Sequence, residues 1–218
     1  MRTVIKRIAT GFALGSLFWL SFAQLPPKFF SVVLVLILLQ IIFFEWKNFF
    51  SIYRPMFWLL MPLYPILPFT LLIVMNQDPN YRSLLFILFI IVSSFDTGSY
   101  IAGNLFGKNL IAPNISPHKT WEGAIGGYFS TYIGLAIVLW QLELSKPWWF
   151  IATFTFIVCV LSLIGDMFES YLKRLAKIKD SGNILPGHGG FLDRFDGILF
   201  SVFFFFIFKC QLVSLFGL

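Results

Sequence analysis

The sequence has 218 residues, of which 58% are hydrophobic, 20% aromatic and only 12% charged. Soluble proteins carry roughly 25% charged residues, so this composition excludes an ordinary soluble domain. The formal net charge of +6 needs no nucleic acid partner, because membrane proteins concentrate basic residues where they meet anionic lipid. We therefore predict an all-α polytopic integral membrane protein.

Seven hydrophobic runs follow one another along the chain, and most approach the ~20 residues that a helix needs to cross a bilayer. The first follows a basic N-terminus, as in a signal peptide, but a second run comes at once and favours a membrane helix. The third contains three prolines, so we expect that helix to be kinked or broken. The runs cover residues 8–25, 29–44, 56–75, 83–103, 124–140, 147–166 and 197–217. They predict about seven transmembrane helices.

The basic residues favour one orientation of this map. With the N-terminus inside, twelve of the sixteen lysines and arginines fall in inside segments. Only Lys28, Arg82 and Lys146 fall outside, and Lys209 lies within the last run. By the positive-inside rule the loops at 104–123 and 167–196 are cytoplasmic. We expect a bacterial inner membrane protein with its polar motif loops facing the cytoplasm.

The carboxylates are unevenly spread along the chain. Eight of the ten occur from residue 96 onward, namely Asp96, Glu122, Glu143, Asp166, Glu169, Asp180, Asp193 and Asp196. All of these except Glu143 map to the predicted cytoplasmic side. We interpret residues 1–80 as an N-terminal membrane-helix scaffold and residues 81–218 as the catalytic region.

Asp96 lies inside an apolar run, in the segment SSFDTGSYIAG. A charged side chain in hydrocarbon costs a few kcal/mol even on lenient scales, so it is expected to face the protein interior. Asp96, Tyr100 and Gly103 share one helix face by their spacing. A functional role is favoured over a purely structural hydrogen bond between helices, although both interpretations remain open.

The segment NISPHKTWEGAIGG predicts a helix start, with Ser116 as N-cap and Pro117 at the first helical position. A helix N-terminus offers free N–H groups to an anion, and Lys119 would sit in its first turn. Glu122 follows on the same turn. The alternative is an ordinary capped helix with a lysine that reaches the membrane interface.

In LIGDMFESYLKRLAKIKD, polar residues recur every three or four positions and predict one stripe on a helix that continues from the membrane. A solvated face explains Lys177 well, since cations favour a helix C-terminus. It explains Asp166 poorly, because this residue lies at the membrane boundary. The stripe comprises Asp166, Glu169, Ser170, Lys173 and Lys177.

The stretch GNILPGHGG reads as a turn-rich loop whose glycines permit a close approach to phosphate. The following FLDRFDG opens the last helix and places Asp193 and Asp196 on one face. With Asp166 and Asp96 nearby, these carboxylates suit Mg²⁺, which protein carboxylates and substrate phosphates bind together. Arg194 is suited to a phosphate, whereas a lone histidine in such a loop is more often a hydrogen-bonding residue.

The run from Ser170 to Gly197 resembles the signature of phosphatidate cytidylyltransferases, the CDP-diacylglycerol synthases. The segments FDTGSYIAGNLFGKN, ISPHKTWEGAIGG and GDMFES resemble the same family, so the likeness covers about residues 90–200. Departures from the usual pattern are Ser99, Asn104 and His118. The resemblance implies transfer of a cytidylyl group from CTP to phosphatidic acid at the cytoplasmic membrane face, with Mg²⁺ as cofactor. It also implies a possible homodimer, and no nucleic acid partner.

The resemblance implies roles for individual residues. The candidate catalytic residues are Asp166, Lys173, His188, Asp193, Arg194 and Asp196. The candidate metal ligands are Asp166, Asp193 and Asp196, with Asp180 and Asp96 as second candidates. The candidate substrate-binding residues are Asp96, Ser116, Lys119, Arg174, Lys179, Gly189 and Gly190. Glu122 and Ser170 match the pattern without an assigned role.

Two alternatives remain at this point. One is a CTP-dependent enzyme that acts on another lipid, such as a polyprenol kinase or an archaeal-lipid cytidylyltransferase. The other is a transporter or a non-catalytic scaffold that uses the same charges for ion passage or assembly.

Overall fold

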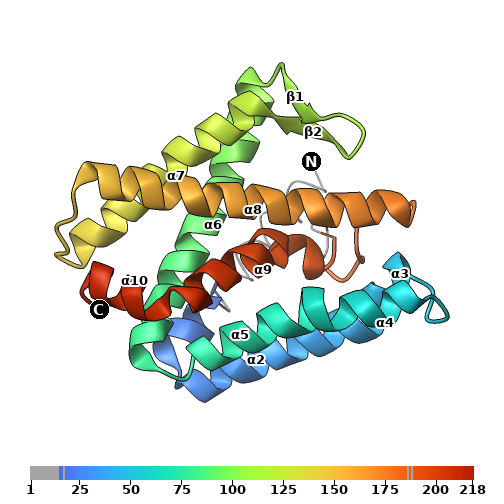
Figure 1. Ribbon diagram of the computed structural model, residues 1–218, viewed down its shortest axis with the longest axis horizontal. Helices are drawn as coiled ribbons and strands as arrows, with labels where there is room; N and C mark the ends of the chain where they lie inside the picture. Colours follow the sequence, from blue (N-terminus) through green and yellow to red (C-terminus); the bar gives the residue numbers. More distant parts are fainter. Residues whose placement is uncertain (1–14, 17, 186, 188) are drawn as a thin grey trace.

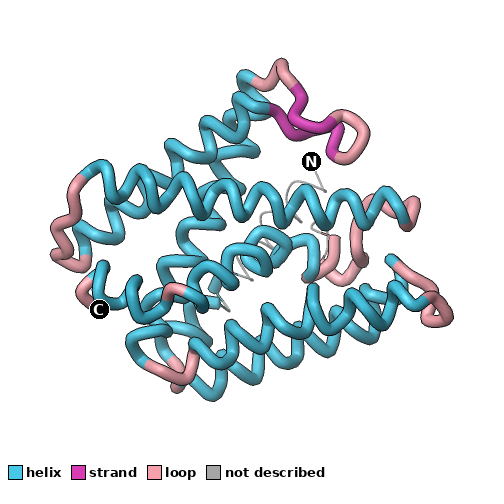
Figure 2. Tube along the Cα trace, in the orientation of Figure 1, coloured by secondary structure: helices cyan, strands magenta, loops and turns pink. Residues whose placement is uncertain are grey.

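The computed structural model describes residues 15–16, 18–185, 187 and 189–218, which form mainly long helices (Figures 1 and 2). The helical elements are η1 (Leu20–Gln24), α2 (Pro27–Gln40), η2 (Ile41–Glu45), α3 (Trp46–Phe49), α4 (Pro55–Met61), η3 (Pro62–Ile66), α5 (Leu67–Met75), α6 (Pro79–Phe106), α7 (Trp121–Gln141), α8 (Trp148–Leu175), α9 (Leu192–Ile207) and α10 (Lys209–Phe216). One short antiparallel hairpin, β1 (Leu110–Ala112) and β2 (Ser116–Thr120), joins α6 to α7.

Among the described residues, five helical segments are long and apolar enough to cross a bilayer, and α9 with α10 forms a sixth candidate that bends by 82°. The five cover residues 27–49, 55–75, 79–106, 121–141 and 148–175. All six match hydrophobic runs predicted from residue 29 onward, which confirms an integral membrane protein. The predicted run 8–25 lies mostly outside the described residues, so the predicted count of seven helices is not confirmed.

The proline-rich third run is distorted but continuous. Its middle, Pro62–Ile66, is a π-helical segment with Pro65 inside it, and α-helix resumes at Leu67. A π-turn contains one residue more than an α-helical turn. It can therefore accommodate prolines, which have no backbone N–H to donate. The predicted distortion is confirmed, and residues 55–75 remain one span.

The hairpin corrects one prediction, the helix start at Ser116; the described residues are otherwise mostly helical, in line with the predicted all-α class. Residues Ser116–Thr120 form strand β2, and α7 begins at Trp121 with Thr120 as its N-cap. The Thr120 hydroxyl accepts the Gly123 N–H at 3.1 Å. Ser116 and Pro117 are therefore strand residues. Their local sequence favours a helix start, but the segment instead pairs with β1 as a strand.

Glycines allow the helices to approach closely near the site. A Cβ on Gly127 of α7 would lie 2.8 Å from the Phe95 ring of α6. A Cβ on Gly165 of α8 would collide with the backbone carbonyl of Asp196 on α9. Gly197 of α9 adds a contact with α6, because a Cβ there would lie 3.3 Å from Val92. Together these contacts bring Asp96 of α6 and Asp166 of α8 to the same part of the bundle as the start of α9.

The polar connections gather toward one part of the molecule. In Figure 1 the β1–β2 hairpin, the α8–α9 loop and the α3–α4 turn lie toward the top and right, whereas the α7–α8 connection and the C-terminus lie at the left. These three described segments, which the charge distribution assigns to the inside, thus lie on a common side of the helices.

Candidate active site

A cavity of about 860 Å³ opens between α6, the hairpin, α8, the α8–α9 loop and α9. Nine of the predicted site residues line it: Asp96, Ser116, Lys119, Asp166, Lys173, Asp180, Asp193, Arg194 and Asp196. Tyr100, on the Asp96 face of α6, lines it too. The fold therefore assembles motifs separated by up to 100 residues into one chamber that holds both carboxylates and cations.

Asp166 of α8 forms an ion pair with Lys119 of β2 across the cavity wall. Both side chains are about a quarter exposed, so the pair borders the cavity rather than the hydrophobic core. Burial lowers the pKa of the Lys119 ammonium to about 8. Lys119 thus lines the cavity from a strand, and not from the first turn of a helix as predicted; its role at a phosphate stays a prediction.

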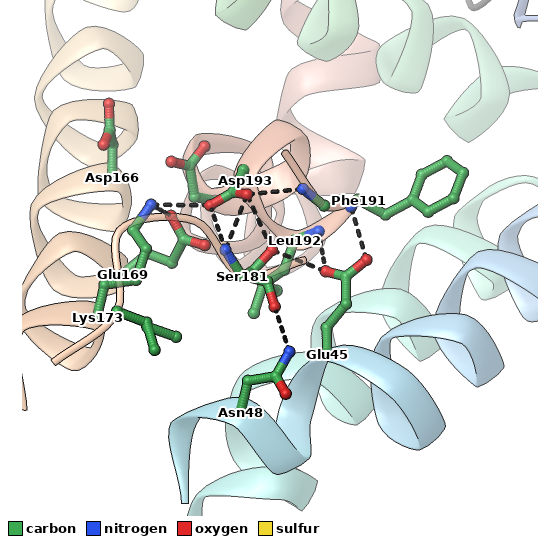
Figure 3. Close-up of polar contacts among 12 residues, drawn as sticks. Glu45, Asn48, Asp166, Glu169, Lys173, Ser181, Phe191, Leu192 and Asp193 are labelled. Carbon is green, nitrogen blue, oxygen red and sulfur yellow. Dashed lines mark hydrogen bonds and ion pairs between the residues drawn. The ribbon is translucent and has the colours of Figure 1, made fainter. Parts of the chain in front are cut away.

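Lys173 of α8 bridges two carboxylates. Its Nζ lies 2.5 Å from Glu169 Oε2 and 2.9 Å from Asp193 Oδ1 (Figure 3). The lysine side chain is 12% exposed, Glu169 is fully buried and Asp193 is 6% exposed. A cation shared by two buried carboxylates has little freedom to reach a phosphate. The structure therefore places Lys173 as the group that neutralises this cluster.

Asp193 fastens the α8–α9 loop to the start of α9. Its carboxylate accepts the Ser181 N–H at 3.0 Å, the Ser181 hydroxyl at 3.0 Å and the Gly190 N–H at 2.8 Å (Figure 3). Gly189 has a φ of +79°, and a Cβ there would collide with the Asp193 carboxylate. The glycines of this loop therefore make room for Asp193 and for a backbone turn.

Sequence comparison places this arrangement in a known family. A sequence model of the cytidylyltransferase family matches residues 2–211. The chain belongs to the cytidylyltransferase family. Membership makes it a nucleotidyltransferase enzyme, as predicted.

Several curated relatives of this cytidylyltransferase carry the name phosphatidate cytidylyltransferase. The protein from Rickettsia prowazekii is 38% identical over 209 residues, covering 92% of this chain and 89% of the relative. The protein from Rickettsia conorii is 34% identical over 215 residues, covering 96% and 92%. The protein from Staphylococcus haemolyticus is 45% identical over 112 residues, covering 51% and 43%. The family resemblance noted in the sequence is therefore confirmed.

The carboxylates of this cytidylyltransferase have the donor chemistry for a magnesium ion. Hard oxygen ligands suit Mg²⁺, and five aspartates line the cavity: Asp96, Asp166, Asp180, Asp193 and Asp196. Among the described residues, however, no group of three or more His, Cys, Asp or Glu side chains is arranged to hold a metal ion. Asp193 is instead held by Lys173 and the loop. The predicted metal ligands therefore fit in type but are not assembled as a cluster.

Four substrate-binding candidates lie outside the cavity lining: Arg174, Lys179, Gly189 and Gly190. The Arg174 Nε donates to the Ile115 carbonyl at 3.0 Å, which braces the hairpin against α8. Lys179 is exposed, and the two glycines pack against the Asp193 loop. Phosphate-binding roles for these four residues stay predictions, and His188 lies outside the described residues.

Sequence reasoning did not single out two carboxylates of the cytidylyltransferase. Glu169 was seen only as part of a polar stripe, yet it is fully buried against Lys173. Glu45 lay in the predicted scaffold, yet it accepts hydrogen bonds from the loop and from α9. The available signal for Glu45 was an acidic residue directly after the apolar run 29–44.

The hairpin has its own carboxylate. Glu122, in the first turn of α7, accepts the Lys108 N–H at 3.1 Å and the Asn109 side-chain amide at 2.6 Å. This residue, which had no assigned role, therefore ties the start of the hairpin to α7. It positions β2, and with it Lys119, over the cavity.

Proposed function

We propose that this chain transfers the cytidylyl group of CTP to phosphatidic acid, giving CDP-diacylglycerol and pyrophosphate. The observation that carries the proposal is the cavity itself, in which carboxylates and cations meet at one end of membrane-spanning helices. A water-soluble nucleotide and a lipid headgroup both have access to such a place, because the acyl chains stay in the bilayer. The names of the relatives support the same pair of substrates.

The reaction forms one P–O bond and breaks another. A phosphate oxygen of phosphatidic acid attacks the α-phosphorus of CTP. The bond from that phosphorus to the bridging oxygen of the β-phosphate breaks, and its electron pair leaves with pyrophosphate. Such a transfer asks the protein for positioning and charge stabilisation and requires no side-chain nucleophile.

Different residues of the cavity provide charge stabilisation and positioning. Lys119 and Arg194 lie on different elements of the lining, β2 and α9, and supply positive charge to the phosphates. Asp166 holds Lys119 in place through their ion pair. The Lys173 cluster fixes the start of α9, so that Arg194 and Asp196 keep their positions relative to α8.

We also propose Mg²⁺ as the cofactor. Asp96, Asp166 and Asp196 are the cavity carboxylates that we propose for it. Asp193 is held by Lys173 and by three hydrogen bonds of the loop, whereas the partner of Asp166 is the partly exposed Lys119. A bound divalent cation would neutralise phosphate charge and orient the triphosphate. The location that this proposal requires is the cytoplasmic face of a bacterial inner membrane, where CTP is present.

An acceptor panel tests the function. Purified protein is given CTP and Mg²⁺ with phosphatidic acid, a polyprenol, a polyprenyl phosphate or an archaeal-type ether lipid, and pyrophosphate release is measured. We expect release with phosphatidic acid and little with the others. Release that depends on a different acceptor, or no release with any, would overturn the proposal.

The orientation gives a separate prediction. In a background without Cys159 and Cys210, single cysteines replace Asn183 of the α8–α9 loop and Gln77 of the α5–α6 connection. We expect an impermeant thiol reagent to label the residue-77 cysteine in intact cells and the residue-183 cysteine only after lysis, because the basic loops face the cytoplasm. Labelling of the residue-183 cysteine in intact cells would contradict the orientation.

A third prediction concerns Arg194, which lines the cavity in the first turn of α9. Arg194→Lys keeps the charge but loses the bidentate geometry suited to phosphate. Loss of one charge-assisted contact costs roughly 1.5–3 kcal/mol, or about one to two decades in kcat/KM. CTP with Mg²⁺ should raise the melting temperature of the variant less than that of the wild type. Equal kinetics and equal shifts would show that Arg194 is only a membrane anchor.

A further inference from the structure

Glu45 lies at the end of the π-helical segment η2, and its side chain is almost fully buried, with 1% exposure. It belongs to the helix 27–49, far in sequence from the family motifs. A buried carboxylate needs hydrogen-bond donors to offset the loss of water. Its donors come from the α8–α9 loop and the start of α9, which lie 136 to 147 residues away.

The carboxylate of Glu45 caps α9 from outside that helix. Oε1 accepts the Phe191 N–H at 2.8 Å, and Oε2 accepts the Leu192 N–H at 2.9 Å (Figure 3). Phe191 is the N-cap position of α9 and provides no capping side chain of its own. The first N–H groups of a helix need acceptors, and a negative charge there is favoured by the helix dipole.

Ser181 connects Glu45 to Asp193. Its hydroxyl lies 2.9 Å from Glu45 Oε2 and 3.0 Å from Asp193 Oδ2, so the two carboxylates share one donor (Figure 3). Three residues after Glu45, the side-chain amide of Asn48 donates to the Ser181 carbonyl at 2.8 Å. The end of helix 27–49 therefore holds the loop segment that also binds Asp193.

Two glycines of the loop fit around Glu45. A Cβ on Gly190 would collide with the Glu45 carboxylate and the Ser181 hydroxyl. A Cβ on Gly182 would lie 3.1 Å from Glu45 Cγ. Close approach of Glu45 thus accounts for glycine at positions where a phosphate contact was predicted from the sequence.

We propose that Glu45 is a positioning residue for the cytidylyl transfer, acting through the start of α9. It fixes the backbone of Phe191 and Leu192, and thereby the side chains that the next turn of α9 presents to the cavity. The proposal rests on the proposed function for its kinetic consequence, but not for its structural one. A π-turn that directs Glu45 is consistent with a functional constraint, since such turns are frequent at functional sites.

The test compares Glu45→Gln with a matched control. Gln keeps the volume of the side chain but loses the charge and turns an NH₂ group toward one backbone N–H. We expect kcat per folded molecule to fall about 10- to 100-fold, because small misplacements of reacting groups have effects of this size. Glu45→Asp, which keeps the charge on a shorter side chain, should restore part of the loss.

The control is Asn76→Ala. Asn76 is also fully buried and joins two helices of the same N-terminal region, donating to the Pro27 carbonyl at 2.7 Å and the Ser31 hydroxyl at 2.9 Å. We expect its loss to lower the melting temperature while kcat per folded molecule stays unchanged. If Glu45→Gln behaves in the same way, Glu45 has only a structural role and the inference is wrong.

Hydrogen exchange separates this inference from the proposed function. Without substrate, Glu45→Gln should increase amide exchange in peptides covering residues 189–197, while peptides covering residues 79–95 stay as in wild type. Unchanged exchange at 189–197 would overturn the inference whatever the enzyme's substrate. Failure of the wild type to form CDP-diacylglycerol would instead overturn the function and leave the exchange result intact.

Discussion

Asp166→Asn is expected to lower kcat/KM by about 10²–10³-fold, the size of effect seen when one preorganised electrostatic group is removed from an active site. The side chain keeps its volume and loses the charge that pairs with Lys119 at the cavity. Stability should change little, because partly exposed ion pairs contribute only about 0–1 kcal/mol. The measurement is CTP kinetics in detergent at saturating Mg²⁺, with thermal melting of the same samples.

Glu143→Gln is the matched control for Asp166. It also removes one carboxylate, but from the connection between α7 and α8, away from the motif loops. We expect wild-type kinetics from it. Wild-type kinetics from Asp166→Asn as well would mean that this carboxylate pairs with Lys119 but takes no part in the reaction. The proposed role of Asp166 in the active site would then be wrong.

Lys173→Met should produce the largest loss of stability among these variants. It removes the cation between Glu169 and Asp193 and leaves two buried carboxylates without their partner. Breaking a buried ion pair in this way costs about 3–5 kcal/mol in free energy of unfolding. Equilibrium unfolding in mixed detergent measures this loss.

Two further variants check the reason for that loss. Glu169→Gln combined with Lys173→Met removes one of the two buried carboxylates that lack their partner. The double variant should therefore be more stable than Lys173→Met alone. Lys177→Met, at an exposed position just after α8, should leave stability almost unchanged. If Lys173→Met is as stable as Lys177→Met, the buried cluster is not what holds α8 to α9.

The membrane spans were predictable because hydropathy is a local property. Six hydrophobic runs correspond to described helical spans, and even the distortion at Pro62 and Pro65 followed from the missing proline N–H groups. The hairpin was not predictable in this way. Ser116-Pro117 has the local preferences of a helix start, but pairing of β2 with β1 and the alternative cap at Thr120 overrode them.

The candidate site was predictable where its chemistry lay in contiguous motifs. Asp166, Asp193 and Asp196 were singled out because charged residues are rare in so apolar a chain and because their motifs resemble the family signature. All three line the cavity, and their roles as metal ligands stay predictions. The role of Lys173 was not predictable, because its two partners become visible only when α8 and α9 pack together. Glu45 is the clearest example of a role that contiguous motifs do not reveal, since its three hydrogen-bond donors lie more than 130 residues away in the sequence.

The fate of each CTP phosphate distinguishes cytidylyl transfer from phosphoryl transfer. Purified protein is incubated with phosphatidic acid and Mg²⁺, and with CTP labelled at either the α- or the γ-phosphorus. Cytidylyl transfer predicts that the α-label enters the lipid phase and the γ-label appears in pyrophosphate. Entry of the γ-label into lipid would show phosphoryl transfer of the kinase type, and no label in lipid from either CTP would show that the cavity does not carry out this chemistry.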